Sequence, residues 1–253
     1  MNNLTAATSS TVPATAGTGR FIEVAEPPVI HLLELPPTAD ELPYDDGEPM
    51  ETQRHVWQML LLIQALEYHW VNRQDFFVGG NMFLYYSLDQ VRNRDFRGPD
   101  FFVVQGVERG ERKSWVMWEE AKGPDLVIEL LSDSTAERDK NEKMLIYQDR
   151  LRVPEYFLYD PFSGELSGYT LRDGKYQPVA PDAEGRFVSG QLGLSLARWR
   201  GKYQGIDTEW LRWATLDGQV LPVPEEIAEQ EHGRAERLAA RLRELGVDPD
   251  TLK

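Results

Sequence analysis

An acidic residue stands in the middle of an apolar segment of the chain. Residues 126–131 read Leu-Val-Ile-Glu-Leu-Leu, and Ser, Asp and Thr residues follow directly. A short apolar run that ends at turn-forming residues is typical of a strand buried on both faces. An ionised carboxylate is almost never placed in such a strand unless another group pairs with it. Glu129 is therefore either a structurally satisfied acid or an acid that is retained because it binds something.

The size and composition of the chain are those of a folded, soluble protein. Its 253 residues are enough for one sizeable domain with appendages, and a hydrophobic content of 41% is enough for a core. No segment reaches the roughly 18 apolar residues of a membrane span, and the N-terminus lacks the basic start and apolar core of a secretory signal. The absence of cysteine excludes disulfides and thiolate nucleophiles or ligands. We therefore expect a cytoplasmic protein with no membrane partner.

The net charge of −15 is unevenly distributed along the chain. Residues 1–50 carry eight acids and one base, and residues 225–253 carry eight acids and five bases. Residues 51–224 hold the other 26 acids and 21 bases, so their net charge is only −5. Broad coating of DNA is not expected, because phosphate contacts require Lys and Arg. A local phosphate contact by the central part of the chain is compatible with this charge.

Two appendages flank a central domain, which we assign to residues 51–200. Residues 1–50 are rich first in Ser, Thr and Ala and then in Pro and acids, which predicts a disordered N-terminal arm. Residues 201–253 form an extension that ends in a charged helix over residues 224–245. Apolar residues follow one stripe of that helix. The stripe is short, so it allows a homodimer without requiring one.

The central domain has the pattern of an α/β fold. Apolar residues recur at helical spacing from Thr52 to about Arg73, and Ser134 and Glu137 have the spacing of a capping box that begins a helix ending near Arg150. The order of helices and strands predicts a mixed sheet with a helix on each side. The expected strands are short aromatic or β-branched runs at residues 76–78, 82–87, 100–104, 126–131, 155–159 and 166–171.

Two acids occupy comparable places on two of these strands. Asp100 stands at the head of Asp-Phe-Phe-Val-Val, and Glu129 lies inside the apolar run. If the two strands pair, the carboxylates converge, and Mg²⁺ prefers one or two carboxylates with water and phosphate oxygens as its other ligands. Lys143 is the candidate cation beside them, on the helix that leaves the Glu129 strand. Asp139 lies one helical turn before Lys143 on the same face.

Three segments of the chain resemble the Uma-two family of the restriction-endonuclease-like superfamily: GPDFFVV, GPDLVIELLSDSTAERDKNEKMLIYQDRLRVPEYFLYDP and GQLGLSL. The superfamily is named for a Pro-Asp…(Asp/Glu)-x-Lys motif, and the resemblance spans about residues 51–200. It implies a restriction-endonuclease-like fold and a Mg²⁺-dependent hydrolase that cleaves nucleic acid, DNA more than RNA. In this reading Asp100 and Glu129 are catalytic metal ligands, and Mn²⁺ can substitute for Mg²⁺.

The chain departs from the superfamily motif at one position. The motif places a lysine two residues after the second acid, where this chain has Leu131. The resemblance implies that Lys143 on the following helix takes its place and orients the attacking water or stabilises the phosphorane charge. Asp139 would then fix Lys143. If Lys143 does not reach the two acids, the chain is an inactive relative of the family.

Other charged residues have a weaker pattern. Arg92, Arg94 and Arg97 precede Asp100 and either contact phosphates that flank the cleaved bond or form a solvated loop balanced by Asp95. The four histidines lack the mutual spacing of metal ligands, so core or surface roles are expected for them: His31, His55, His69 and His232.

Two alternatives to a nuclease stay open at this point. The first is an interaction module that keeps the fold without turnover, which the acidic balance and Leu131 favour. It predicts that an internal partner sequesters Glu129. The second is a glycosidase that uses Asp100 and Glu129 as a carboxylic acid pair, which would require an open cleft between them.

Overall fold

A six-stranded mixed sheet forms the centre of the protein. The computed structural model describes residues 20–26, 29–43, 52–93, 98–132 and 139–249. Within this sheet β7 and β8 run parallel and every other neighbouring pair is antiparallel, so the predicted mixed α/β sheet is confirmed. In sheet order the strands are β10 (Lys175–Val179), β9 (Leu166–Arg172), β8 (Glu155–Tyr159), β7 (Leu126–Leu130), β5 (Phe101–Gln105) and β3 (Phe76–Gly79).

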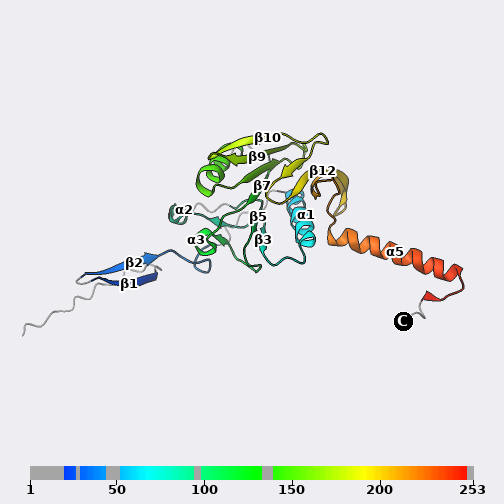
Figure 1. Cartoon of the computed structure of the whole chain (residues 1–253), viewed down its shortest axis with the longest axis horizontal. Helices are drawn as coiled ribbons and strands as arrows, with labels where there is room; N and C mark the ends of the chain where they lie inside the picture. Colours follow the sequence, from blue (N-terminus) through cyan, green and yellow to red (C-terminus); the bar gives the residue numbers. More distant parts are fainter. Residues whose placement is uncertain (1–19, 27–28, 44–51, 94–97, 133–138, 250–253) are drawn as a thin grey trace, which may run out of the picture.

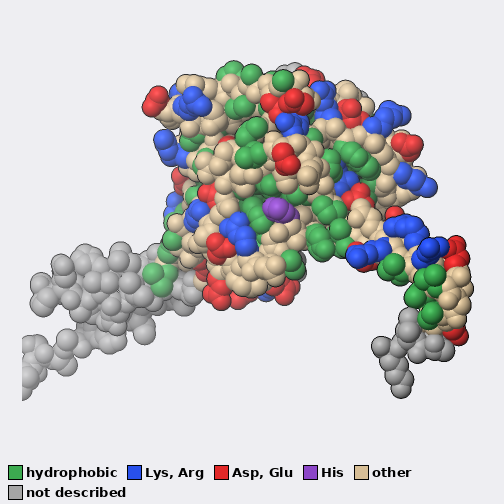
Figure 2. Space-filling model, turned by 45° about the vertical axis from the view of Figure 1, so that its right-hand side comes forward, with side chains coloured by type: hydrophobic (Ala, Val, Ile, Leu, Met, Phe, Trp, Pro, Cys, Tyr) green, Lys and Arg blue, Asp and Glu red, His purple; other side chains and the backbone are tan. Residues whose placement is uncertain are grey.

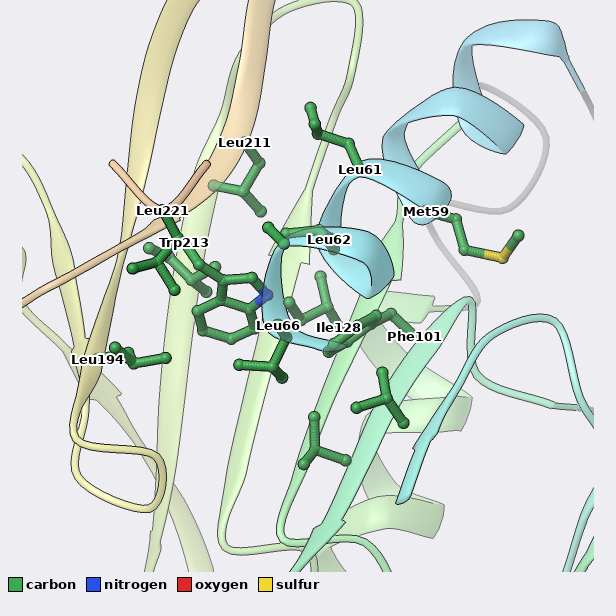
Figure 3. Packing of buried hydrophobic residues seen from close by; sticks show 14 of the residues in the cluster. Met59, Leu61, Leu62, Leu66, Phe101, Ile128, Leu194, Leu211, Trp213 and Leu221 are labelled. Atoms are coloured by element: carbon green, nitrogen blue, oxygen red, sulfur yellow. The ribbon is translucent and has the colours of Figure 1, made fainter. Parts of the chain in front are cut away.

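Helix α1 (Gln53–His69) covers one face of this sheet. The helix predicted from the apolar spacing is confirmed, and Leu62 and Leu66 lie on its buried side, which meets the sheet. There they belong to one buried cluster with Phe101 of β5 and Ile128 of β7 (Figure 3). Alternate residues of each strand point to the same face, so this contact uses the odd residues of β5 and the even residues of β7.

A helical segment with wide turns covers the opposite face. Its two π-type stretches are η1 (Asp139–Lys143) and η2 (Ile146–Leu151). Tyr147 from this segment packs in a second buried cluster with Val127 of β7 and Leu158 of β8. Because both faces are covered, all five residues of β7 are buried. The Ser134 and Glu137 capping box lies outside the described residues.

A second sheet lies against α1 and extends the core. It contains β11 (Phe187–Ser189), β12 (Leu194–Tyr203) and β13 (Ile206–Ala214), all antiparallel. Trp213 of β13 is fully buried beside the α1 leucines (Figure 3). The same cluster continues to Val223, beyond the boundary at residue 200 that the sequence suggests. Apolar residues after position 200 are therefore part of the central core.

Part of the N-terminal region is attached to the body of the protein. Strands β1 (Arg20–Glu26) and β2 (Val29–Leu35) form an antiparallel hairpin. After it, Leu42 is buried in a small cluster, and the Trp118 indole donates a hydrogen bond to the carbonyl of Pro37 at 2.7 Å. Residues 36–43 lie in the segment predicted as a disordered arm. The burial of Leu42 and the hydrogen bond to Pro37 nevertheless attach these residues to the central domain.

The remaining elements are short except for the last helix. Helix α5 (Pro224–Glu244) leaves the second sheet and extends away from the body of the protein (Figure 1). No helix in the described part of the chain is both long and apolar enough to cross a membrane. The short elements are β4 (Leu84–Tyr85), α2 (Leu88–Asn93), β6 (Trp115–Val116) and α3 (Met117–Glu120).

One buried side chain joins α1 to the second sheet, which leads to a stability prediction. The Gln58 amide donates to the carbonyl of Leu211 and accepts from its amide, both at 2.9 Å. Replacing Gln58 with Leu should lower the free energy of unfolding by about 2–3 kcal/mol, because both backbone groups lose their partner in a dry site. Urea denaturation measures this. The Gln64→Leu variant is the control, since Gln64 is only partly buried and binds a single hydroxyl, that of Tyr203. An equal loss of unfolding free energy in both variants would contradict the prediction.

Candidate active site

The register of β5 and β7 places two acids opposite each other. Phe101 pairs with Ile128, so the preceding Asp100 stands across from Glu129. The amide of Asp100 donates to Glu129 Oε2 at 3.3 Å, and the amide of Leu130 donates to Asp100 Oδ2 at 2.7 Å. Each carboxylate is thus tied to the backbone of the other strand. By strand alternation both acids belong to the face that η1 and η2 cover.

Glu129 is fully buried and takes two further donors from the helical segment. The ammonium of Lys143 lies 3.1 Å from Glu129 Oε2, and the Tyr147 hydroxyl donates to Oε1 at 2.8 Å. Burial raises the pKa of Glu129 to about 7; Lys143 opposes this rise, and the neighbouring Asp100 carboxylate adds to it. A strongly raised pKa of this kind is typical of functional sites.

The helical segment brings Lys143 and Tyr147 to Glu129 together because the two residues are four positions apart and share a face. The side chain of Lys143 is 15% exposed, whereas that of Glu129 is fully buried. The rings of Tyr147 and Tyr156 pack against each other with tilted planes and 5.2 Å between their centroids. Burial raises the pKa of the Tyr147 hydroxyl well above its usual value, and Glu129 adds to this rise, so Tyr147 acts as a hydrogen-bond donor.

His55 is a neighbour of this site whose role the sequence does not indicate. It lies in the first turn of α1, with Nδ1 2.7 Å from the Thr52 hydroxyl and Nε2 3.2 Å from the carbonyl of Leu131, two residues after Glu129. The expected core role for this histidine agrees with its burial. The contact between His55 and the carbonyl of Leu131 connects α1 to the end of β7. Because the two residues are 76 positions apart, no local sequence pattern indicates this contact.

Other predicted site residues are not brought to the two acids by the described structure. Arg92 on α2 is exposed and pairs with Asp89 at 3.4 Å. Arg94 and Arg97, like the side chain of Asp139, lie outside the described residues. Asp125, the acid of the second Gly-Pro-Asp, was not predicted for the site, and it has a structural role: it accepts from the amide of Gln105 at 2.6 Å and pairs with Lys122.

The donor set of the site fits a magnesium ion of the kind that is held by two carboxylates. Asp100 and Glu129 would supply hard oxygen ligands for such an ion, with water or phosphate oxygens as the others. Within the described ranges no group of three or more His, Cys, Asp and Glu side chains could hold a metal. Both oxygens of Glu129 already accept hydrogen bonds, so a cation here would share this carboxylate with Lys143.

Comparisons with known proteins give a family match and a similar solved structure. A family profile named Uma2 and described as "Putative restriction endonuclease" matches residues 30–209. Among solved structures, the chain is similar to a crystal structure described as a putative nuclease belonging to DUF820 from Anabaena variabilis ATCC 29413. The sequence identity is 17% and the TM-score 0.42, and the match covers 61% of this chain and 89% of the other. No curated protein matches the chain.

Proposed function

The chain belongs to the Uma2 family, and from this premise we propose that it is a Mg²⁺-dependent endonuclease that hydrolyses phosphodiester bonds in DNA. The observation that carries the proposal is the convergence of Asp100, Glu129 and Lys143, which come from a strand start, a strand interior and a helix. Two carboxylates beside one lysine are the groups that a metal-assisted phosphodiester hydrolysis needs.

In this proposal Asp100 and Glu129 bind the metal, which when present supplies an activated water and stabilises negative charge on the phosphate. Lys143 donates hydrogen bonds to that water or to a phosphate oxygen. Tyr147 and the Asp100 amide hold the Glu129 carboxylate in one orientation. Asp139 is proposed to fix Lys143.

Contacts to the rest of the nucleic acid are a further part of the proposal. Arg92, Arg94 and Arg97 precede Asp100 in the sequence and would neutralise phosphates that flank the cleaved bond. Such contacts fix the position of a duplex without reading its sequence. The acidic balance of the whole chain fits a few local contacts of this kind rather than a long basic surface.

A second candidate is an interaction module with the same fold and no turnover. The ion pair between Glu129 and Lys143 favours it, because an internal cation already neutralises the buried acid. The glycosidase alternative has no such support. The Glu129 side chain is fully buried, whereas the paired carboxyl groups of a glycosidase stand about 5–9 Å apart with the sugar between them.

Cleavage assays with matched variants test the nuclease proposal. The full chain is incubated with supercoiled plasmid and with single- and double-stranded oligonucleotides, in Mg²⁺, Mn²⁺ or EDTA. We expect cleavage in either metal and none in EDTA. Asp100→Asn and Glu129→Gln keep the size of each side chain and remove its charge, so each should slow cleavage by about 100-fold or more.

Glu155→Gln is the matched control for these variants. Glu155 is also buried, and burial also raises its pKa, but its carboxylate binds Ser189 and the amide of Gly190 instead of the candidate site. Its variant should cleave like the unchanged protein. Metal-independent cleavage, or equal activity in all variants, would overturn the proposal. A folded protein that binds no Mn²⁺ and cleaves no substrate would support the interaction module.

A further inference from the structure

The turn that follows β8 presents an aromatic ring to solvent. Phe162 is 62% exposed, which makes it the most exposed aromatic side chain among the described residues. The phenylalanines of β5 and β8 are at most 1% exposed: Phe101, Phe102 and Phe157. A single exposed apolar residue is ordinary on a protein surface. The use of this ring therefore depends on how it is held and on what lies near it.

The turn holds the backbone of Phe162 in one conformation. The Asp160 carboxylate accepts from the Phe162 amide at 2.8 Å, and it accepts from the amide and the hydroxyl of Ser163 at 3.2 and 2.7 Å. The Arg54 guanidinium donates to the carbonyl of Pro161 at 3.0 Å. Hydrogen bonds thus fix the residues on both sides of Phe162. A ligand that meets the ring does not have to order this segment first, which lowers the entropic cost of binding.

Two side chains from the first turn of α1 lie beside the Phe162 ring. The Arg54 guanidinium carbon is 5.3 Å from the ring centroid, and the centroid of the His55 ring is 5.9 Å away at an interplanar angle of 54°. The Thr208 hydroxyl of β13 accepts from Arg54 at 3.1 Å and helps to keep the guanidinium in place. The ring therefore meets the protein on part of its surface and leaves the rest to solvent.

Phe162 lies at the same edge of the central sheet as the two acids. Strands β7 and β8 are parallel and in register, so the segments that follow them lie together at this edge. His55 connects the two places, because its Nε2 atom is 3.2 Å from the carbonyl of Leu131. Along this path the ring is on the order of 15 Å from Glu129, since two extended residues span about 7 Å. About five nucleotides of one strand cover that distance at about 3.4 Å each.

We propose that Phe162 stacks on an unpaired base of the strand that is cut at the candidate site, so that the preferred substrate is DNA with unpaired bases. This inference rests on the proposed nuclease function and specifies its substrate. Inside an intact duplex the neighbouring bases cover both faces of each base, so an exposed ring can reach such a face only where the base has left the stack. Every base has a π face, so the contact selects unpaired strands without selecting a sequence.

Base stacking also suits the charge of this chain. The net charge is −15, and binding through phosphates alone requires many Lys and Arg contacts. On the face that Figure 2 shows, the basic side chains of the protein body are interspersed with acidic ones. Stacking depends on contact between two π surfaces and needs no net positive charge. The Arg54 guanidinium beside the ring adds a cation–π contribution to a stacked base.

The affinity for a fluorescent single-stranded oligonucleotide measures this contact. Fluorescence anisotropy of the full chain is recorded in Ca²⁺ instead of Mg²⁺, and a gel verifies that the strand stays intact. The unchanged protein should bind the single strand about 10-fold or more tightly than the matching duplex. Phe162→Ala should weaken binding of the single strand about 10-fold or more.

Three further variants separate stacking from other effects of the substitution. Phe162→Leu keeps an apolar side chain without a π surface and should lose as much affinity as Phe162→Ala. Phe162→Trp keeps a π surface and should bind within a few-fold of the unchanged protein. Tyr68→Ala is the control and should bind like the unchanged protein. Tyr68 is also an exposed aromatic residue, but it lies in the last turn of α1, about 20 Å along the helix from Arg54.

Abasic nucleotides then identify the base that the ring meets. One base at a time is removed along the oligonucleotide. At one position the removal should weaken binding by the unchanged protein about 10-fold, but binding by Phe162→Ala less than about twofold, because that contact is already lost. If no position behaves in this way, or if Phe162→Leu binds as tightly as the unchanged protein, the ring does not stack on a base and the proposal is overturned.

The result can be separated from that of the nuclease proposal. Equal binding of the single strand by the unchanged protein and Phe162→Ala overturns the stacking, while Mg²⁺-dependent cleavage of plasmid still supports the nuclease. Coupling between Phe162 and one base supports the stacking even if Asp100→Asn cleaves as fast as the unchanged protein, a result that overturns the catalytic role of the two acids. A chain that binds no oligonucleotide overturns both proposals.

Discussion

Replacing Lys143 with methionine is expected to lower the free energy of unfolding by about 1 kcal/mol at pH 8 and by much less at pH 5. Methionine keeps most of the aliphatic volume of lysine and removes the ammonium that lies 3.1 Å from Glu129. At pH 8 the variant has no cation beside Glu129, so this fully buried acid must either stay ionised without a cation or take up a proton. Its remaining donors are the Tyr147 hydroxyl and the Asp100 amide.

The sign of this pH dependence follows from the raised pKa of Glu129. Burial gives this acid a pKa of about 7 in the folded protein, against 4.5 for an ordinary glutamate. The folded state then binds a proton more tightly than the unfolded state, so stability falls as the pH rises between these values. Without Lys143 the folded pKa rises further, because Lys143 lowers it. The decrease in the free energy of unfolding with rising pH is therefore larger in the Lys143→Met variant and continues to higher pH.

Urea denaturation of both proteins from pH 5 to pH 8 measures the effect. Burial also raises the pKa of Glu155, but this acid contributes equally to both proteins and cancels in the difference. The double variant Glu129→Gln with Lys143→Met should recover most of the loss at pH 8, since neither charge is left unpaired. An equal loss at both pH values would show that lost packing, and not the buried charge, explains the effect.

The mixed sheet and its two main helices could be predicted because local patterns specify them. Helix α1 and strand β7 are marked by apolar spacing alone, and their bounds in the structure lie close to those expected from the sequence. The alternation of strand residues also puts Asp100 and Glu129 on one face once their strands pair. The pairing of β5 with β7 connects residues 29 positions apart. The sequence pattern does not predict this pairing, so the meeting of the two acids could only be stated on the assumption that the strands pair.

The contacts that the sequence could not predict all join distant segments. The Gln58 side chain binds the backbone of Leu211 across 153 positions, and this contact brings β13 into the core. Leu42 and Trp118 are apolar residues in segments without a clear period, so their contribution to the attachment of residues 36–43 leaves no pattern to read. Such contacts depend on which surfaces remain free after the central sheet has formed.

Replacing Gly98 with alanine is expected to reduce both stability and the proposed activity, because Gly98 lies where two backbone segments cross. A Cβ atom at this position would overlap the carbonyl group of Met82, and a backbone group cannot rotate away as a side chain can. The amide of Asn81 also donates to the carbonyls of Pro99 and Asp100, at 3.1 and 3.3 Å. Relief of the overlap must therefore move the segment that carries Asp100.

The expected loss of unfolding free energy is about 2 kcal/mol, a typical value for overpacking in a close contact. If the nuclease proposal is right, a displacement of Asp100 by about 1 Å should slow cleavage by about 100-fold. Gly80→Ala is the matched control, since its Cβ would meet the flexible side chains of Met59 and Ile63 instead of backbone. Urea denaturation and plasmid cleavage should leave this control within about 1 kcal/mol and a few-fold of the unchanged protein. If Gly98→Ala matched the control in both measurements, the close crossing of the two segments would not be what positions Asp100.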